Sequence, residues 1–191
     1  MRLVGMAVAA VVGLGLLAGC SSGRTANETL PPSASSPAET SATLPPLGPP
    51  DLPMPDEARE QTAAGAEAFL RYYMDVYTAA QASMDPTYMD QLSHDCETCN
   101  RIIGEINTDA SAGYTYQGGE VTVEYVDTTN PKDSVAEAVF SLYQAPLAVV
   151  GQDGQPLPDL TFGERKSPGC GAILGWDRGE HTWVINQWDI N

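Results

Sequence analysis

Two cysteines three residues apart, Cys96 and Cys99, are the sharpest chemical feature of the sequence. A C-x-x-C pair can close a small disulfide loop, act as a redox centre, or supply two thiolate ligands to a metal. Redox-active pairs follow a strand and open a helix in a βαβ unit, whereas this pair follows a predicted helical turn. We therefore expect a Cys96–Cys99 disulfide that staples the start of a helix, because thiols of exported proteins usually pair.

Two alternatives for these thiols stay open. A zinc site of His94, Cys96, Cys99 and Cys170 is conceivable because thiolates and imidazole suit zinc, although no second C-x-x-C and no H-x-H sequence supports it. Cys170 is the odd thiol, and it could pair with Cys96 or Cys99 instead, or lie buried and inert. The sequence predicts no metal site and no cofactor.

Aromatic residues form the second group of candidates. They fall on a predicted helix and on predicted strands, where they could line a cavity or simply pack in a core. No G-x-S-x-G sequence and no Gly-rich phosphate loop is present, and the Ser, Asp and Glu residues are scattered. We therefore predict no catalytic residue, and we name as possible cavity lining Tyr73, Tyr77, Tyr125 and Phe140.

The charge of the chain is strongly acidic, with 25 Asp and Glu residues against 9 Lys and Arg residues. From Asp51 onward the ratio is 23 to 7, so the C-terminal part alone carries a net charge of −16. Binding to phosphate backbones or anionic lipid headgroups needs clustered positive charge. The composition therefore argues against nucleic-acid binding and favours solubility outside the cell.

The N-terminus has the pattern of an export signal, predicted over residues 1–19. A single positive charge at Arg2 precedes an apolar run from Leu3 to Leu17, which is too short for an ordinary membrane-spanning helix. The sequence Leu17-Ala18-Gly19-Cys20 resembles a bacterial lipobox, in which the cysteine receives a diacylglycerol and the peptide is cut before it. The resemblance implies lipidation at Cys20 and a cell-membrane anchor on the extracellular face.

Residues 20–55 are predicted to be a disordered tether. They are rich in Ser, Thr, Ala and Pro and offer few large apolar side chains to offset the entropy of ordering. Pro-rich chain favours polyproline II, which extends roughly 3.1 Å per residue. Such a tether would hold a single domain, residues 56–191, away from the membrane.

The first half of this domain is predicted to be helical. Apolar residues recur at spacings of three and four from Thr62 to Ala80, which indicates one face of an amphipathic helix. Asp85-Pro86 ends that pattern. The predicted helices cover about Asp56–Ser83, Thr87–Leu92 and Glu97–Ala110.

After Gly113 the period changes to two, which indicates half-buried strands. Val121, Val123 and Tyr125 are expected on one face of the first strand, and Ala136 to Leu142 alternate in the second. A Gly/Pro loop is expected over Gln152–Pro158. The predicted strands cover Val121–Tyr125, Val135–Tyr143, Leu160–Arg165, Ala172–Trp176 and Thr182–Ile190.

Helices followed by antiparallel strands predict an α+β fold in which helices cover one face of a sheet. This order resembles the cone-shaped nuclear-transport-factor-two-like (NTF2-like), or cystatin-like, fold, in which a long helix lies in the concave face of a curved sheet. The hairpin from Trp176 to Ile185 resembles the last hairpin of many extracellular members. Some enzymes of this fold, such as ketosteroid isomerase, use a Tyr and an acid in the cone, and Asp75 or Asp189 are the acids that this comparison would nominate.

Three patches carry a further resemblance. Pro53–Arg59, the stretch from Gly65 to Tyr73, and Asp95-Cys96-Glu97-Thr98-Cys99 resemble an actinobacterial lipoprotein family that is defined by a domain of unknown function (DUF6318). The resemblance implies a lipid-anchored extracellular location and no particular activity.

Two classes of function follow as expectations. The first is a non-catalytic binding or protein-docking module at the cell envelope, whose partner is an envelope protein or an apolar small ligand. The second is a small cone-fold enzyme or carrier for an apolar ligand, which would use a Tyr and a buried carboxylate. We expect a closed, apolar-packed cone, with any contacts on its surface.

Overall fold

The structure is a computed structural model that describes residues 46–190. The predicted signal peptide, the lipidation site at Cys20 and the tether up to residue 45 lie outside the described residues. No helix within the described range is long and apolar enough to cross a bilayer.

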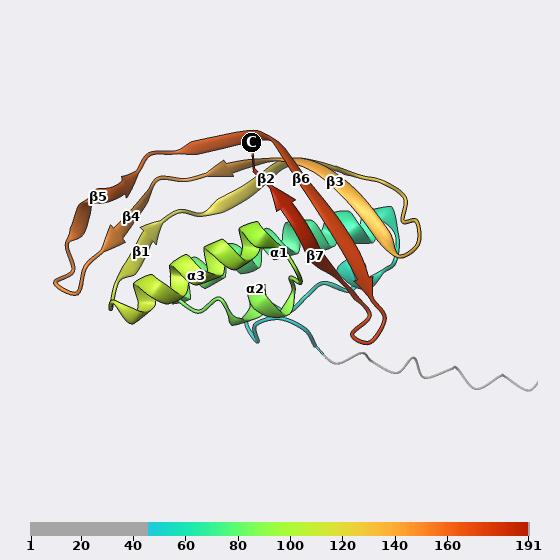
Figure 1. The fold of residues 1–191 in the computed structure, drawn as a ribbon, viewed down its shortest axis with the longest axis horizontal. Helices are drawn as coiled ribbons and strands as arrows, with labels where there is room; N and C mark the ends of the chain where they lie inside the picture. The colour runs from blue at the N-terminus through green and yellow to red at the C-terminus, as the bar shows by residue number, and fades with distance from the viewer. Residues whose placement is uncertain (1–45, 191) are drawn as a thin grey trace, which may run out of the picture. The chain divides into compact units, whose positions relative to one another are not determined.

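The predicted α+β class is confirmed, with helices first and antiparallel strands afterwards (Figure 1). In chain order the elements are η1 (Asp56–Arg59), α1 (Ala63–Ser83), α2 (Thr87–Gln91), α3 (Glu97–Ser111), β1 (Thr115–Gly118), β2 (Val121–Thr128), β3 (Val135–Gln144), β4 (Leu147–Val150), β5 (Pro156–Phe162), β6 (Arg165–Asp177) and β7 (Thr182–Asp189).

The strands form two antiparallel sheets that continue one another. One sheet has the order β2-β3-β6-β7 and the other has the order β1-β4-β5. Because β1 leads into β2, β3 into β4 and β5 into β6, three long strands cross from one sheet to the other at a common line of bends (Figure 1). This line of bends gives the combined surface its curvature.

Backbone conformation explains the bend between β1 and β2. Gly118 and Gly119 both have positive φ, at 75° and 85°, which favours glycine. A Cβ atom on Gly118 would also lie only 2.1 Å from the carbonyl oxygen of Pro146, which belongs to the neighbouring bend between β3 and β4. The close approach of these two bends leaves room only for glycine at position 118.

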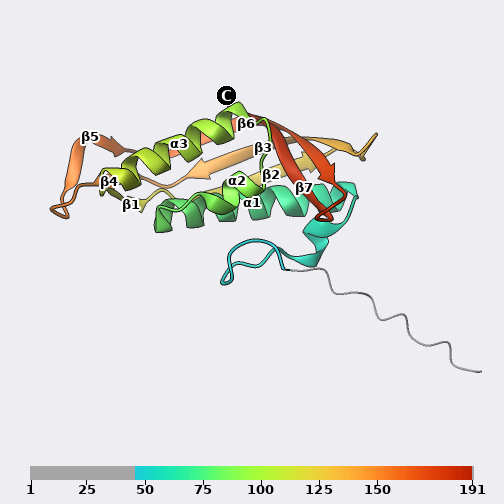
Figure 2. The same ribbon diagram turned by 60° about the horizontal axis from the view of Figure 1, so that its bottom comes forward.

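The helices α1 and α3 lie on the concave side of the strands (Figures 1 and 2). The inward face of α1 supplies fully buried residues such as Phe69, Leu70 and Tyr73, while Ile102 and Ile106 of α3 are also buried. They pack against strand residues that include Phe140, Leu174, Trp183 and Ile185. The predicted arrangement, with a long helix in a curved antiparallel sheet, is therefore confirmed.

Residues 47–54 form a strap that packs on the domain, although the sequence analysis assigned them to the tether. The Met54 amide donates to the Leu47 carbonyl at 2.9 Å, and the Tyr72 hydroxyl donates to the Leu52 carbonyl at 2.9 Å. Met54 is buried, and its Sδ accepts a hydrogen bond from Thr182. The folded part therefore begins before residue 56, because these apolar side chains find a place on the core.

The first predicted helix is divided in two. A 3₁₀ turn, η1, ends at Arg59, and Glu60 is extended, so that α1 begins only at Ala63. Thr62 caps α1, since its hydroxyl accepts a hydrogen bond from the Gly65 amide at 2.9 Å. The break frees the Glu60 carbonyl, which accepts a hydrogen bond from the indole of Trp183 at 2.9 Å.

Candidate functional site

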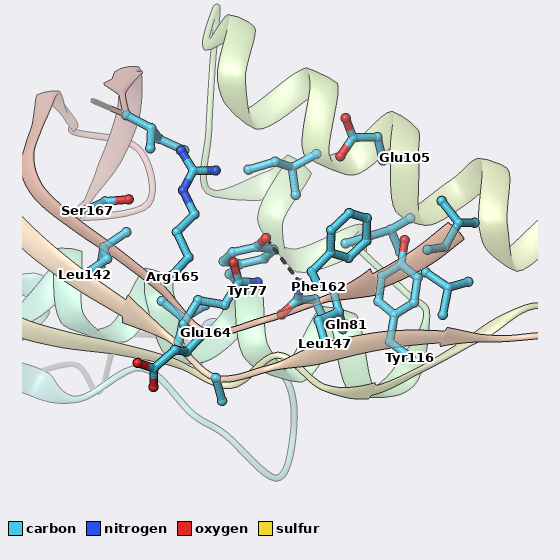
Figure 3. Close-up of a pocket in the computed structure, with 18 of the residues that line it drawn as sticks. Tyr77, Gln81, Glu105, Tyr116, Leu142, Leu147, Phe162, Glu164, Arg165 and Ser167 are labelled. Atoms are coloured by element: carbon cyan, nitrogen blue, oxygen red, sulfur yellow. Dashed lines mark hydrogen bonds between the residues drawn. The ribbon is translucent and has the colours of Figure 1, made fainter. Parts of the chain in front are cut away.

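A pocket of about 850 Å³ opens between α3, the C-terminal half of α1 and the line of bends in the strands (Figure 3). This size lies within the range of small-molecule sites. Its apolar wall comes from α3, β3, β4 and β5, and it includes Ile102, Ile106, Leu142, Leu147, Val149 and Phe162. The expectation of a closed cone is therefore wrong, because the strands bend away from α1 and leave a volume that the side chains do not fill.

Two polar residues of α1 line this pocket. The Gln81 side-chain amide donates a hydrogen bond to the hydroxyl oxygen of Tyr77 at 3.2 Å. Gln81 is only 4% exposed, and its carbonyl oxygen Oε1 has no hydrogen-bond partner. A buried acceptor without a donor costs free energy, about 1–3 kcal/mol.

Trp188 on β7 adds a second unsatisfied group to the lining. Its ring packs edge-on against Tyr77, with centroids 6.0 Å apart, and the residue is 2% exposed. The indole Nε1 is buried and has no hydrogen-bond partner. Two lining residues, Gln81 and Trp188, therefore each hold one buried polar atom without a partner behind the apolar wall.

The charged groups on α3 are already engaged within the protein. Arg101 forms an exposed ion pair with Glu105 at 2.8 Å, one helical turn apart. Asp109 accepts a hydrogen bond from the hydroxyl of Tyr116 at 2.6 Å. These contacts give each of the charged groups a partner within the protein at the rim of the pocket.

Arg165, the first residue of β6, differs from these charged neighbours. Within the described residues its side chain forms no ion pair, and its guanidinium rises into the pocket (Figure 3). The adjacent Glu164 points the opposite way, and it accepts a hydrogen bond from the Tyr143 hydroxyl at 3.1 Å. Arg165 is therefore the cationic group of the pocket that is available to a ligand.

The ionisation of Tyr77 reflects this setting. Burial raises the pKa of Tyr77, and the negative charge of Glu105 raises it further. The positive charges of Arg101 and Arg165 act in the opposite direction. Since burial is the largest cause, Tyr77 is a neutral phenol at physiological pH and can act as a hydrogen-bond donor.

The four residues predicted to line a cavity lie in three different places. Tyr77 lines the pocket. Tyr73 and Phe140 are buried in the core, 0% and 2% exposed, and do not line the pocket. The prediction for Tyr125 is wrong, because a β-bulge between Val123 and Tyr125 reverses the alternation of β2 and leaves Tyr125 55% exposed.

Neither acid nominated for proton transfer belongs to the pocket. Asp75 is exposed on α1, although desolvation raises the pKa of its carboxyl. Asp189 is also exposed, and it accepts a hydrogen bond from Gln187 at 2.6 Å. Neither side chain lines the pocket beside Tyr77, so the cone does not combine a phenol with either acid.

Cys96 and Cys99 form the disulfide expected from their spacing. Both residues are fully buried, and the Cys96 sulfur also accepts a hydrogen bond from the Cys99 amide at the first turn of α3. Cys170 lies buried on β6, outside this bridge. The disulfide removes two ligands from the alternative zinc site, and residues 46–190 contain no group of three His, Cys, Asp or Glu side chains placed to hold a metal.

Sequence reasoning missed most of the pocket lining, including its polar residues Gln81 and Arg165. Gln81 follows Tyr77 by four residues, so it lies on the inward face of α1, and a polar residue at an inward position was the available signal. No comparable signal marked Arg165, because its exposure to the pocket depends on the bend before β6.

Fold and pocket together define the class of this protein as a small α+β domain with an open cavity between a curved sheet and a covering helix. The chain belongs to the family of unknown function DUF6318, which matches residues 38–188. No curated protein matches the sequence.

Several solved structures are similar over about two thirds of the chain. An NTF2-like superfamily protein from Salmonella enterica is 12% identical, with 67% of this chain and 91% of that chain covered and a TM-score of 0.43. A putative calcium/calmodulin-dependent protein kinase II association domain from Xanthomonas campestris is 12% identical, with 66% and 85% covered and a TM-score of 0.42. An uncharacterized protein with a cystatin-like fold from Caulobacter vibrioides is 11% identical, with 64% and 87% covered and a TM-score of 0.39.

Proposed function

We propose that this domain is a non-catalytic binding module that takes a small, largely apolar molecule into the pocket between α3 and the bent strands. The observation that carries the proposal is an accessible cavity of about 850 Å³ with a largely apolar wall. Two of its lining residues, Gln81 and Trp188, also hold a buried polar atom without a protein partner, Oε1 and Nε1, which is uncommon in a native core. The apolar wall would supply most of the binding free energy.

Catalysis has weaker support in this pocket. General acid–base chemistry needs a group that can reach the reacting atom and exchange a proton. The lining carboxylates Glu105 and Asp109 are engaged by Arg101 and Tyr116, and Glu164 points away. Binding and release of an unchanged ligand therefore fits these contacts better than a reaction does.

Filling the pocket should abolish binding. We expect Leu147→Trp to weaken the binding of the neutral probe N-phenyl-1-naphthylamine by more than about tenfold, because the indole would occupy the cavity beside Phe162. The measurement is the increase of probe fluorescence on titration with a fragment of residues 42–191, which contains the described compact unit and its core.

Ala148→Trp is the matched control for this titration. Ala148 is the next residue of β4 and does not line the pocket, because successive side chains of a strand point to opposite faces. It should bind the probe within about twofold of the parent, and both variants should keep a cooperative thermal transition. Equal binding by the parent and a folded Leu147→Trp variant would place the probe elsewhere and refute the proposed site.

We further propose that the domain works at the outer face of the cell membrane, held there by a lipid on Cys20. The lipobox sequence Leu17-Ala18-Gly19-Cys20 supports this location. Cys20→Ala should abolish incorporation of labelled lipid and leave an uncut precursor, because the sulfur is the acceptor of the diacylglycerol. A variant that is still labelled and cut would show that the anchor lies elsewhere, and Cys170→Ala serves as the control.

A further inference from the structure

We propose that the ligand of this pocket is an anionic amphiphile, a single carboxylate on an apolar tail, and that Arg165 binds the carboxylate. The inference rests on the binding function proposed above and specifies the chemistry of its ligand. It is carried by the side chain of Arg165, by the buried donors close to it, and by the distribution of polar and apolar groups along the pocket.

The first step concerns Arg165. Two basic residues, Arg101 and Arg165, line the pocket of this acidic domain. Arg71 and Arg101 pair with Glu67 and Glu105, whereas Arg165 has no such partner in the described range. Its planar guanidinium offers a fork of donors that matches a carboxylate in a bidentate arrangement.

The second step concerns the neighbouring donors. The Trp188 indole N–H is buried without an acceptor, and the Trp188 ring packs edge-on against Tyr77. Tyr77 and Arg165 both line the pocket and are drawn beside each other in Figure 3. These three residues therefore lie in one region of the pocket and can all donate hydrogen bonds. An acceptor-rich, negatively charged group satisfies such donors, whereas an ammonium or a hydrocarbon end does not.

The third step limits the charge of the head group. The carboxylates of Glu105 and Asp109 also line the pocket, so a doubly charged phosphate would meet two further negative charges within the same cavity. Like charges close together are destabilising in a region of low dielectric constant. A head group with a single negative charge, bound by Arg165, is therefore favoured over a doubly charged phosphate.

The pocket also defines the direction in which the apolar tail of the ligand would extend from Arg165. Figure 3 shows Arg165 and Ser167 at one end of the pocket and Leu147, Phe162 and Tyr116 at the other. Phe162 is 50% exposed, which is high for a large apolar side chain that lines a cavity. A tail that extends from Arg165 toward Phe162 would cover this exposed ring, and the gain would come from burial of apolar surface.

The test compares three dodecyl ligands by titration calorimetry, below the critical micelle concentrations of dodecanoate and dodecyl phosphate and below the solubility limit of dodecanol. We expect residues 42–191 to bind dodecanoate more tightly than dodecanol, and dodecyl phosphate no more tightly than dodecanoate. Arg165→Gln should weaken dodecanoate binding by about tenfold to a hundredfold, since hydrogen bonds to charged groups contribute about 1.5–3 kcal/mol. The affinity for dodecanol should stay within about twofold in the same variant.

Lys166→Gln is the matched control because it removes the same charge from the next residue of β6. Lys166 lies over the Tyr143 ring and does not line the pocket. Lys166→Gln should leave the affinity for dodecanoate within about twofold of the parent. An equal loss of affinity in Arg165→Gln and Lys166→Gln would mean that only the overall charge matters, and it would overturn the inference. Equal binding of dodecanol and dodecanoate would also overturn it while leaving the binding function intact, and absence of binding by all three ligands would refute both.

Discussion

Replacing Trp183 with alanine is expected to lower the free energy of unfolding by about 3–5 kcal/mol, the range for large aromatic side chains in a core. Trp183 is completely buried and packs edge-on against Trp176, with ring centroids 5.2 Å apart. Its indole also donates to the Glu60 carbonyl, across 123 residues of sequence. The variant therefore loses apolar burial, an aromatic contact and a link between β7 and the start of α1.

Urea denaturation followed by circular dichroism measures this effect. Trp183→Phe keeps much of the apolar volume but removes the N–H, so it should show a smaller loss than the alanine variant. Val139→Ala is the control on the sheet, because Val139 is 58% exposed, and it should stay within about 0.5 kcal/mol of the parent. A loss below about 1 kcal/mol for Trp183→Ala would contradict the central position assigned to this residue.

The second large effect is a loss of stability at alkaline pH. Burial raises the pKa of Tyr72 from 10.0 to about 12, and burial also raises the pKa of Tyr73. In the unfolded chain these phenols release their protons near pH 10, whereas the folded protein retains them to higher pH. The unfolded state therefore binds fewer protons above pH 10, so the free energy of unfolding falls as the pH rises. Between pH 10 and 12 the loss from Tyr72 alone should be about 2–3 kcal/mol, and below pH 10 the contribution is fully present.

Tyr73→Phe isolates one of these groups. The Tyr73 hydroxyl is buried and has no hydrogen-bond partner, so its removal should be neutral or slightly stabilising at pH 7. Above pH 10 the free energy of unfolding should fall less steeply with pH in the variant than in the parent. The difference in slope should correspond to the release of one proton fewer on unfolding. Urea midpoints at pH 8, 10 and 11 provide the comparison, with Tyr125→Phe as a control at an exposed phenol. If the urea midpoints of the parent and of Tyr73→Phe fell in parallel with rising pH, Tyr73 would not contribute to the loss of stability at alkaline pH.

The predicted helices were the most reliable part of the sequence analysis because their signals are local. The spacing of apolar residues in α1, and the cysteine pair that opens α3, depend on neighbours three or four positions away. The strand β3 was equally clear, since Ala136, Ala138, Phe140 and Leu142 alternate on its buried face without interruption. The Cys96–Cys99 bridge followed from the spacing of the two cysteines together with the predicted export of the chain.

The differences between the sequence predictions and the structure arise where the strands of the sheet are irregular. The bulge in β2 inserts one residue and turns Tyr125 outward, which alternation alone cannot anticipate. The strands β1 and β4 have four residues each and adjoin Gly118-Gly119 and Pro146, and the sequence pattern predicted no strand at either place. The pocket was missed for a related reason, since the volume beside Gln81 depends on how far the bent strands move from α1 and not on any residue pattern.

The strap of residues 47–54 has a mechanical consequence. A pull on the chain from its N-terminal side would reach the contacts of Leu47, Leu52 and Met54 before it reached α1. These contacts would be loaded one after another, as in peeling, while the many hydrogen bonds between β3, β6 and β7 would carry no load until the strap had detached. The strap can thus act as a sacrificial segment that lengthens the chain under tension before the sheet is loaded.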